Sequence, residues 1–188
     1  MPAPMDEAIA AIRAMEQATL TTEGIEGLVL RYGFFYGPGT GFGPGGYSAG
    51  EIARRRYPIV GPGTGRFSFI HIDDAVEATV LALDRGNGGG PASGPHVRAS
   101  GTPHGIYNVV DDEPAAARDW IPAMAAAMGA KPPRRVPLWL AKLVVGGLAA
   151  QMVAQRGSSN AKARRELGFA PRYPTYREGF PAVFRAGG

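Results

Sequence analysis

The glycine-rich loop that follows the first apolar run carries a pattern that many proteins use to hold phosphate groups. Gly41, Gly43 and Gly46 satisfy G-x-G-x-x-G, whose glycines let the backbone of a helix N-terminus approach an anionic ligand closely. Pro44 removes one backbone N–H donor inside the pattern, and Asp73 lies too far downstream to be the acidic partner expected about 20 residues on. We therefore predict a long flexible loop and not a phosphate site.

His71, Asp73 and Asp74 form a cluster whose residue types would suit a metal site or a proton-transfer site. The other two histidines, His96 and His104, fit no standard metal-ligand spacing with this cluster. We predict a structural role instead, in which Asp73 or Asp74 caps the helix that follows.

A second acidic cluster consists of Asp111, Asp112 and Glu113, with Pro114 directly after it. Negative side chains and proline are both favoured in the first turn of a helix, where the macrodipole and the unpaired N–H groups suit them. We predict that these residues begin a helix and are not a pair of catalytic carboxylates.

Nucleophilic and tyrosine-based acid–base chemistry find no support in the sequence. Ser48, Ser68 and Ser93 lack a nearby His–Asp arrangement, which argues against a hydrolase triad. None of the seven tyrosines is followed by lysine four residues later, an arrangement in which the lysine lowers the pKa of a tyrosine general base. We assign no catalytic residue in this chain.

The composition indicates one globular domain of ordinary size. The chain has 188 residues, of which 45% are apolar and 19% are charged, enough to build a packed core. There is no cysteine, which excludes disulfides and thiolate metal sites and suits a reducing compartment, so we expect a cytoplasmic protein. The formal charge of +4 comes from scattered arginines without interleaved aromatic residues, so we expect no nucleic acid partner.

Hydrophobic periodicity predicts about three strands among five or six helices. Strands are expected over 26–33, 66–72 and 106–110, and helices over 5–20, 49–56, 74–85, 111–129, 158–168 and 173–186. The stretch 86–105 has almost no large apolar residue and is expected to be a flexible loop. This alternation is typical of an α/β fold, with fewer strands than a complete doubly wound sheet has.

The most apolar window of the chain is 136–154. It approaches the length of a membrane span but contains Lys142, Gln151 and a glycine pair. We predict a buried or half-buried helix that starts near Pro137 and expect no membrane partner. Peripheral association of this window with a membrane stays open as an alternative.

Four stretches resemble the C-terminal half of the extended short-chain dehydrogenase/reductases, the NAD-dependent epimerase/dehydratase group. They are "GLVLRYGFFYGPGT" from Gly27, "RFSFIHIDDAVEATVLAL" from Arg66, "GIYNVVDDEP" from Gly105 and "NAKARRELGFAPRYPTYREGF" from Asn160. The resemblance implies an α/β, partial Rossmann-type fold: the last elements of the sheet within 1–40, with 106–110 returning to that sheet, and a small substrate-binding lobe over 41–188.

The resemblance also implies where a ligand would bind. Tyr32 and Gly33 would lie near the nicotinamide of NAD or NADP, and Phe34, Phe35 and Tyr36 would face the substrate. Packing explains Tyr32 and Tyr36 equally well and explains Phe35 better. Phe67 stands where the family has an arginine that contacts substrate phosphates, so the resemblance implies a less charged, more apolar substrate.

Two of the family's motifs have no counterpart here: the N-terminal glycine fingerprint and the Tyr-x-x-x-Lys pair. The implied function is an NAD(P)-dependent oxidoreductase or epimerase/dehydratase that acts by hydride transfer on a secondary alcohol or ketone, with the chain alone inactive. The alternative is a non-catalytic lobe that binds a small molecule or a partner subunit. Strands that lack sheet neighbours invite association, so we expect a homo-oligomer or a partner that supplies the other half.

Overall fold

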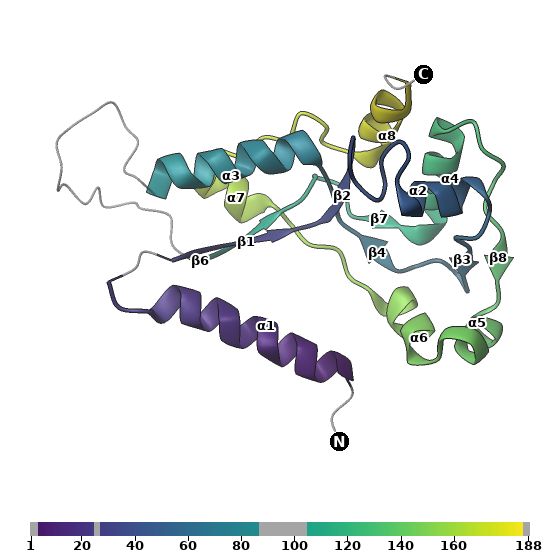
Figure 1. Ribbon diagram of the computed structural model, residues 1–188, viewed down its shortest axis with the longest axis horizontal. Helices are drawn as coiled ribbons and strands as arrows, with labels where there is room; N and C mark the ends of the chain where they lie inside the picture. Colours follow the sequence, from purple (N-terminus) through teal and green to yellow (C-terminus); the bar gives the residue numbers. More distant parts are fainter. Residues whose placement is uncertain (1–3, 25–26, 87–104, 186–188) are drawn as a thin grey trace.

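The computed structural model describes residues 4–24, 27–86 and 105–185, so nearly all of the predicted loop 86–105 lies outside the described residues. Figure 1 shows the order of the elements. The helices are α1 (Pro4–Thr21), α2 (Tyr47–Ala53), α3 (Ile72–Gly86), α4 (Ala117–Ala127), α5 (Leu138–Val145), α6 (Gly147–Ala154), α7 (Ala161–Leu167) and α8 (Tyr176–Arg185). The strands are β1 (Leu28–Tyr32), β2 (Phe34–Tyr36), β3 (Ile59–Val60), β4 (Arg66–Phe67), β5 (Phe69–His71), β6 (Gly105–Val109), β7 (Ala115–Ala116) and β8 (Arg135–Val136).

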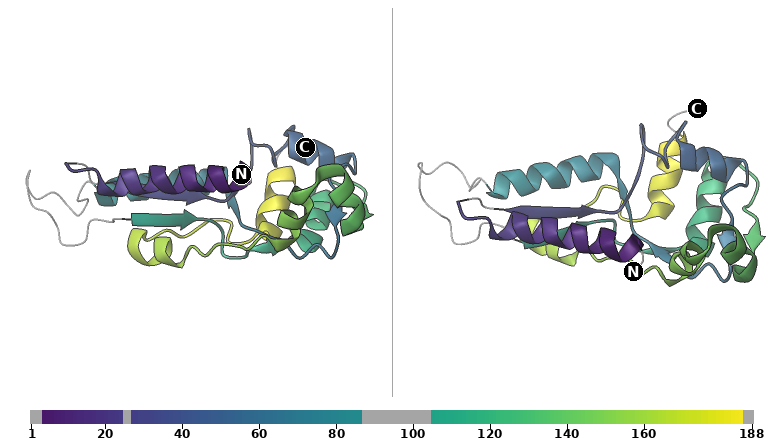
Figure 2. Two further views of the ribbon diagram at one scale, coloured as in Figure 1. Left: turned by 90° about the horizontal axis from the view of Figure 1, so that it is seen from below. Right: turned by 60° about the horizontal axis from the view of Figure 1, so that its bottom comes forward.

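One end of the molecule is a parallel two-stranded layer between helices. β1 and β6 pair in parallel from Leu28↔Gly105 to Tyr32↔Val109. Figures 1 and 2 show α1 on one side of this layer and α3 on the other, with α7 beside β6. The alanines and leucine that α3 and α7 turn inward pack on Tyr107 and Val109. The predicted helix 5–20 and the strands 26–33 and 106–110 are confirmed to within a few residues.

The apolar stripe of α1 does not face the sheet. Ile9, Ile12 and Met15 are exposed, whereas Glu16 is buried and accepts hydrogen bonds from the Arg31 guanidinium. Within the described residues β1 pairs with β6 alone. Both the outer edge of β1 and the apolar side of α1 are therefore open.

The predicted strand 66–72 is wrong in one respect, because the structure breaks it at Ser68. β4 pairs antiparallel with β7, whereas β5 pairs in parallel with β2. The Ser68 carbonyl accepts the Phe34 N–H at 2.8 Å, and its Oγ accepts the Ser158 N–H at the same distance. These two bonds hold Ser68 at a corner where the chain changes partners.

The prediction that Asp111 begins a helix is also wrong, since α4 starts only at Ala117. The Asp111 N–H donates to the Phe69 carbonyl and the Asp112 N–H donates to the Pro174 carbonyl, so the segment is tied to neighbouring strands and loops. The predicted end of this helix at Gly129 is confirmed. Gly129 has φ +67°, and the Gly129 and Ala130 N–H groups donate to the carbonyls of Ala126 and Ala125.

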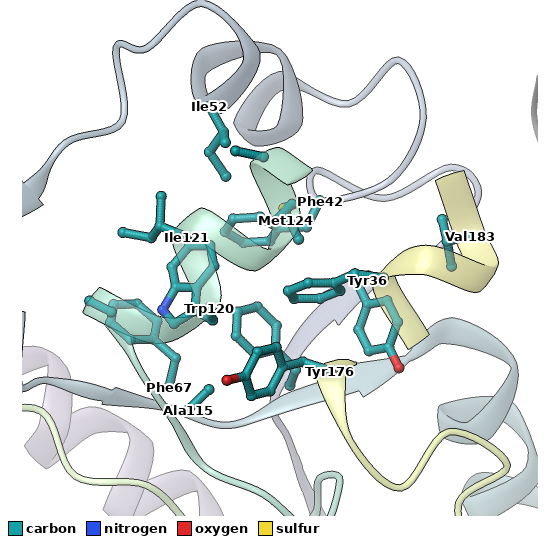
Figure 3. Packing of buried hydrophobic residues seen from close by; sticks show 14 of the residues in the cluster. Tyr36, Phe42, Ile52, Phe67, Ala115, Trp120, Ile121, Met124, Tyr176 and Val183 are labelled. Carbon is teal, nitrogen blue, oxygen red and sulfur yellow. The ribbon is translucent and has the colours of Figure 1, made fainter. Parts of the chain in front are cut away.

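The other end of the molecule is built around an aromatic core. Figure 3 shows the Trp120 indole of α4 among side chains that come from the glycine-rich loop, from β2, β4, β7 and from α8. The Trp120 ring lies 5.0–5.6 Å from the ring centroids of Phe42, Tyr57, Phe67 and Phe69. Aromatic pairs at this spacing add to the free energy gained by burial.

The apolar window 136–154 forms two helices instead of the one predicted. α5 and α6 are separated by Gly146, whose φ of +57° suits glycine. Ala141 and Ala149 are buried together with Val60, and Leu138, Met152 and Val153 pack partly buried against them. The two helices are therefore half-buried, with one side covered and the other exposed. No helix within the described ranges is long and apolar enough to cross a membrane.

Candidate functional site

A pocket of about 360 Å³ opens where β1 and β6 end, at the carboxyl ends of two parallel strands. In open α/β sheets this is the edge where ligands bind. The lining comes from four separate parts of the chain, namely the β1–β2 junction, the Ser68 corner, the end of β6, and the segment after α6. Its residues are Arg31, Tyr32, Gly33, Phe34, Ser68, Asn108, Val110, Gln155, Arg156 and Ser158.

Gly33 is the point at which the strand changes partners. Its N–H still donates to the Val109 carbonyl of β6, whereas the next residue, Phe34, already donates to the Ser68 carbonyl. A Cβ on Gly33 would lie 2.6 Å from the Ser68 carbonyl oxygen and 3.1 Å from a methyl group of Val110. Glycine is required here because two backbone segments approach each other closely.

We expect Gly33→Ala to lower the free energy of unfolding by about 1–3 kcal/mol, because the Ser68 backbone cannot give way as a flexible side chain would. Urea denaturation followed by circular dichroism measures the change. Gly147→Ala in α6 is the matched control: no atom lies within 4 Å of the added Cβ, and alanine favours a helix. Equal stability of the two variants would contradict the close approach at Gly33.

Tyr32 lines the pocket at the end of β1. Its hydroxyl shares a 2.6 Å hydrogen bond with Thr79 Oγ1 of α3. The residue is 37% exposed, and its ring packs at 5.4 Å against the ring of Phe35. The hydroxyl of Tyr32 is therefore engaged by α3, and Phe35 supports the ring by packing.

Phe34 faces both the pocket and the core. It remains 40% exposed, while its ring contacts those of Phe67 and Phe69 at 5.2 and 6.1 Å. Its exposed side gives the pocket an apolar wall.

Tyr36 and Phe67, the other two expected substrate contacts, are buried in the aromatic core. Burial raises the pKa of the Tyr36 hydroxyl, and the nearby carboxyls of Asp111 and Asp74 act in the same direction. Tyr36 also lies so close to Gly179 of α8 that a Cβ there would overlap the hydroxyl. A tyrosine in this environment packs and does not serve as a general base near neutral pH.

Several polar lining residues were not predicted from the sequence. Asn108 donates to the Ser159 carbonyl at 3.3 Å, so β6 is tied to the segment that follows α6. Arg156 is exposed at the pocket. The only sequence signal for these residues is a polar side chain inside the apolar strand "GIYNVV" and a short Gln–Arg–Gly–Ser run after the apolar window.

The histidine–aspartate cluster is structural, as predicted, but its roles differ from the expected ones. His71 Nδ1 accepts the Asp73 N–H at 3.2 Å and so caps α3. Asp74 accepts the N–H groups of Arg172 and Tyr173 and anchors the loop before α8. The predicted aspartate cap is wrong because the helix already starts at Ile72, ahead of both aspartates. Within residues 4–24, 27–86 and 105–185, no group of three or more His, Asp or Glu side chains is placed to hold a metal ion.

The glycine pattern uses its N–H groups internally. Gly43 donates to the Thr40 carbonyl, and Gly46 donates to the Gly43 carbonyl. A Cβ on Gly43 or Gly46 would overlap a backbone carbonyl of the same loop. These glycines permit a tight loop, and the N–H groups of Gly43 and Gly46 are already occupied within it.

Comparison with known proteins relates this chain to one protein family. The sequence model of the NAD-dependent epimerase/dehydratase family matches residues 8–98. A 3-diazoavenalumate denitrifying reductase from a Streptomyces species is 37% identical over 172 residues, which cover 91% of this chain and 51% of that protein. These matches confirm the resemblance to the NAD-dependent epimerase/dehydratase family. The chain spans about half the length of this curated relative.

Solved structures of the extended short-chain dehydrogenase/reductase type confirm the α/β, Rossmann-type fold of this chain. The human epimerase family protein SDR39U1, solved with NADPH, superposes with a TM-score of 0.69 at 18% identity and covers 95% of this chain and 55% of its own. The UDP-glucose 4-epimerase of Thermus thermophilus, solved with NAD, superposes with a TM-score of 0.61 at 22% identity. The match covers 97% of this chain and 53% of the epimerase. These likenesses concern the fold.

Proposed function

We propose that this chain supplies the nicotinamide edge and the substrate lobe of an NAD(P)-dependent oxidoreductase or epimerase/dehydratase. The observation that carries the proposal is the pocket at the carboxyl ends of β1 and β6, walled by Tyr32, Gly33 and Phe34. When bound, the cofactor would supply hydride transfer at a secondary alcohol or ketone.

The residues fit one end of a dinucleotide and not the whole of it. A volume of about 360 Å³ lies at the lower end of the range for ligand pockets. The exposed faces of Tyr32 and Phe34 suit a flat ring, whereas the N–H groups of the glycine pattern are paired within their own loop. We assign Tyr32 and Gly33 to the nicotinamide side and Phe34 to the substrate side.

The wall of the pocket favours a substrate with an apolar or aromatic part. Phe34 is exposed at the pocket. By the family resemblance, Phe67, which is buried in the aromatic core behind Phe34, stands at the position of the arginine that contacts substrate phosphates. Arg66 cannot replace that arginine because its guanidinium donates to the Pro114 carbonyl at 2.8 Å, on the outer side of β4. Arg31 is paired with Glu16, which leaves Arg156 as the lining cation best placed to meet an acidic group.

A calorimetric titration with NAD⁺, NADH, NADP⁺ and NADPH, combined with amide NMR shifts, tests the proposal. We expect weak binding in the millimolar range, with shifts at residues 31–34 and at Asn108, and a loss of these shifts in Phe34→Ala. Tyr47→Ala is the matched control, because Tyr47 is an exposed aromatic residue of α2 outside this pocket. Absence of any pocket shift at millimolar ligand would contradict the assignment, and micromolar binding would show that the glycine loop does form a dinucleotide site.

A second candidate function is a non-catalytic lobe that binds a small molecule or a partner. None of the seven tyrosines has the lysine that the family's acid–base pair requires, so this chain alone is proposed to be inactive. The open edge of β1 and the exposed apolar side of α1 suit a second copy or a chain that carries the other half of the sheet. Light scattering that shows a stable monomer would count against this association.

A further inference from the structure

The two helices α5 and α6 form a surface that the proposed function does not use. Figure 1 shows them side by side below β3 and β8, and both views in Figure 2 place them at the opposite end of the long axis from α7. We define the α5–α6 face as Trp139, Leu140, Leu143, Val144, Val145 and Leu148, all of which are exposed. Contiguous apolar side chains on a surface mark an interaction site more often than isolated ones do.

The helical geometry of α5 gathers these side chains outward. Trp139 and Leu143, which are 66% and 76% exposed, stand one helical turn apart, and so do Leu140 and Val144. Ala141, the one buried residue of the helix, lies on the other side. The most apolar side of α5 therefore faces away from the protein.

The apolar surface continues inward as a pocket of about 270 Å³ behind α5. Val60, Val136, Val144 and Met152 contribute aliphatic walls, and Arg56 lies at the same pocket. The face is therefore an apolar surface with a shallow hollow beside it, accompanied by basic side chains.

The segment that carries this face contains charged residues of one sign. The sequence contains no aspartate or glutamate between Asp119 and Glu166, whereas lysines and arginines occur repeatedly in that interval. Lys131, Arg134, Arg135 and Lys142 are exposed, and none of them forms an ion pair with another described residue. These four cations are available to a negatively charged partner.

We propose that the α5–α6 face docks on the surface of an anionic lipid bilayer. Helices that lie in a membrane interface combine tryptophan and leucine on one side with lysine and arginine around them, and basic residues next to the inserted side chains are attracted to anionic headgroups. A second copy of the chain suits the face less well, because symmetric pairing through it would bring the two sets of unpaired cations together. The exposed side of α1 lacks this charge pattern, since Asp6 and Glu7 lie in its first turn.

The two tryptophans make the proposal directly measurable, because Trp120 is fully buried and Trp139 is exposed. The full 188-residue chain is mixed with phosphatidylcholine–phosphatidylglycerol vesicles, with pure phosphatidylcholine vesicles as the reference. We expect co-sedimentation with the anionic vesicles only, reversal by salt, and quenching of part of the emission by brominated lipid. Trp139→Phe should abolish the quenching while the protein still sediments.

Variants separate docking through this face from docking elsewhere. Leu143→Gln combined with Val144→Gln should weaken vesicle binding by about tenfold or more, because two apolar side chains no longer enter the interface. Leu83→Gln, at an exposed leucine of α3, is the matched control and should bind as the parent chain does. Near-ultraviolet circular dichroism confirms that each variant is folded.

Three outcomes would overturn the proposal. One is the absence of binding to anionic vesicles, and another is binding that the Leu143/Val144 variant leaves unchanged. The third is a lipid-free dimer in which Trp139 is protected from the soluble quencher acrylamide, because the face would then be an interface between copies of the chain.

Discussion

Replacing Trp120 with alanine is expected to lower the free energy of unfolding by about 3–5 kcal/mol. Trp120 is completely buried, and its ring contacts aromatic residues from the glycine-rich loop, the segment before β3, and β4 and β5. Removing the indole leaves a cavity between α4 and these strands (Figure 3). Surrounding rings anchored to several elements relax into such a cavity only in part.

Chemical denaturation monitored by far-ultraviolet circular dichroism measures this loss. Trp139→Ala is the matched control, and we expect a change within about 0.5 kcal/mol because that tryptophan is largely exposed. Trp120→Phe should lower the free energy of unfolding by less than the alanine variant does. It keeps an aromatic ring and removes an indole N–H that has no partner among the described residues. Similar losses for Trp120→Ala and Trp139→Ala would mean that the aromatic core is not where the chain gains its stability.

The second large effect concerns pH and the buried carboxyl of Asp111. Burial raises the pKa of this side chain to about 8, and the charges of Asp112 and Glu113 act in the same direction, while the Glu113 backbone partly opposes them. The unfolded chain releases this proton near pH ~4, whereas the folded chain holds it until about pH 8. The folded state therefore binds more protons between these values, and stability falls as pH rises through this range, by at most about 1.4 kcal/mol per pH unit.

Denaturation of the parent chain and of Asp111→Asn from about pH 5 to about pH 8 tests this expectation. The asparagine variant cannot ionise at this position, so its free energy of unfolding should decline less over the range. The difference between the two declines, accumulated from about pH 5 to about pH 8, amounts to as much as about 4 kcal/mol. Burial lowers the pKa of His71, so His71 contributes stability above its unfolded pKa that is lost as pH falls. That contribution occurs in both proteins and cancels in the comparison. Parallel pH profiles would show that Asp111 is hydrated or ionised in the folded protein.

The sequence by itself determined the class of the protein. A short apolar run after turn signals placed the strand 26–33, the run "GIYNVV" placed the strand 106–110, and helical periodicity placed the helix 5–20, because local side-chain spacing fixes such elements. Four stretches in order indicated the epimerase/dehydratase family, which the comparisons confirm. The rejection of the glycine loop as a phosphate site stays a prediction, which rests on Pro44 and on the late helix start in the sequence.

The tertiary structure alone decided the details of the site. The break at Ser68 and the helix start at Ala117 depend on partners that are distant in the chain. The cap from His71 is local, since the bond goes to the Asp73 N–H. Tyr36 was indistinguishable by sequence from a substrate contact, and only packing against α8 showed that it is buried. For the apolar window the sequence left open whether the helix is buried or half-buried, because hydropathy gives the composition of a segment and not the direction it faces; the structure covers one side of it. Which side of a helix is covered is decided by the elements that fold against it.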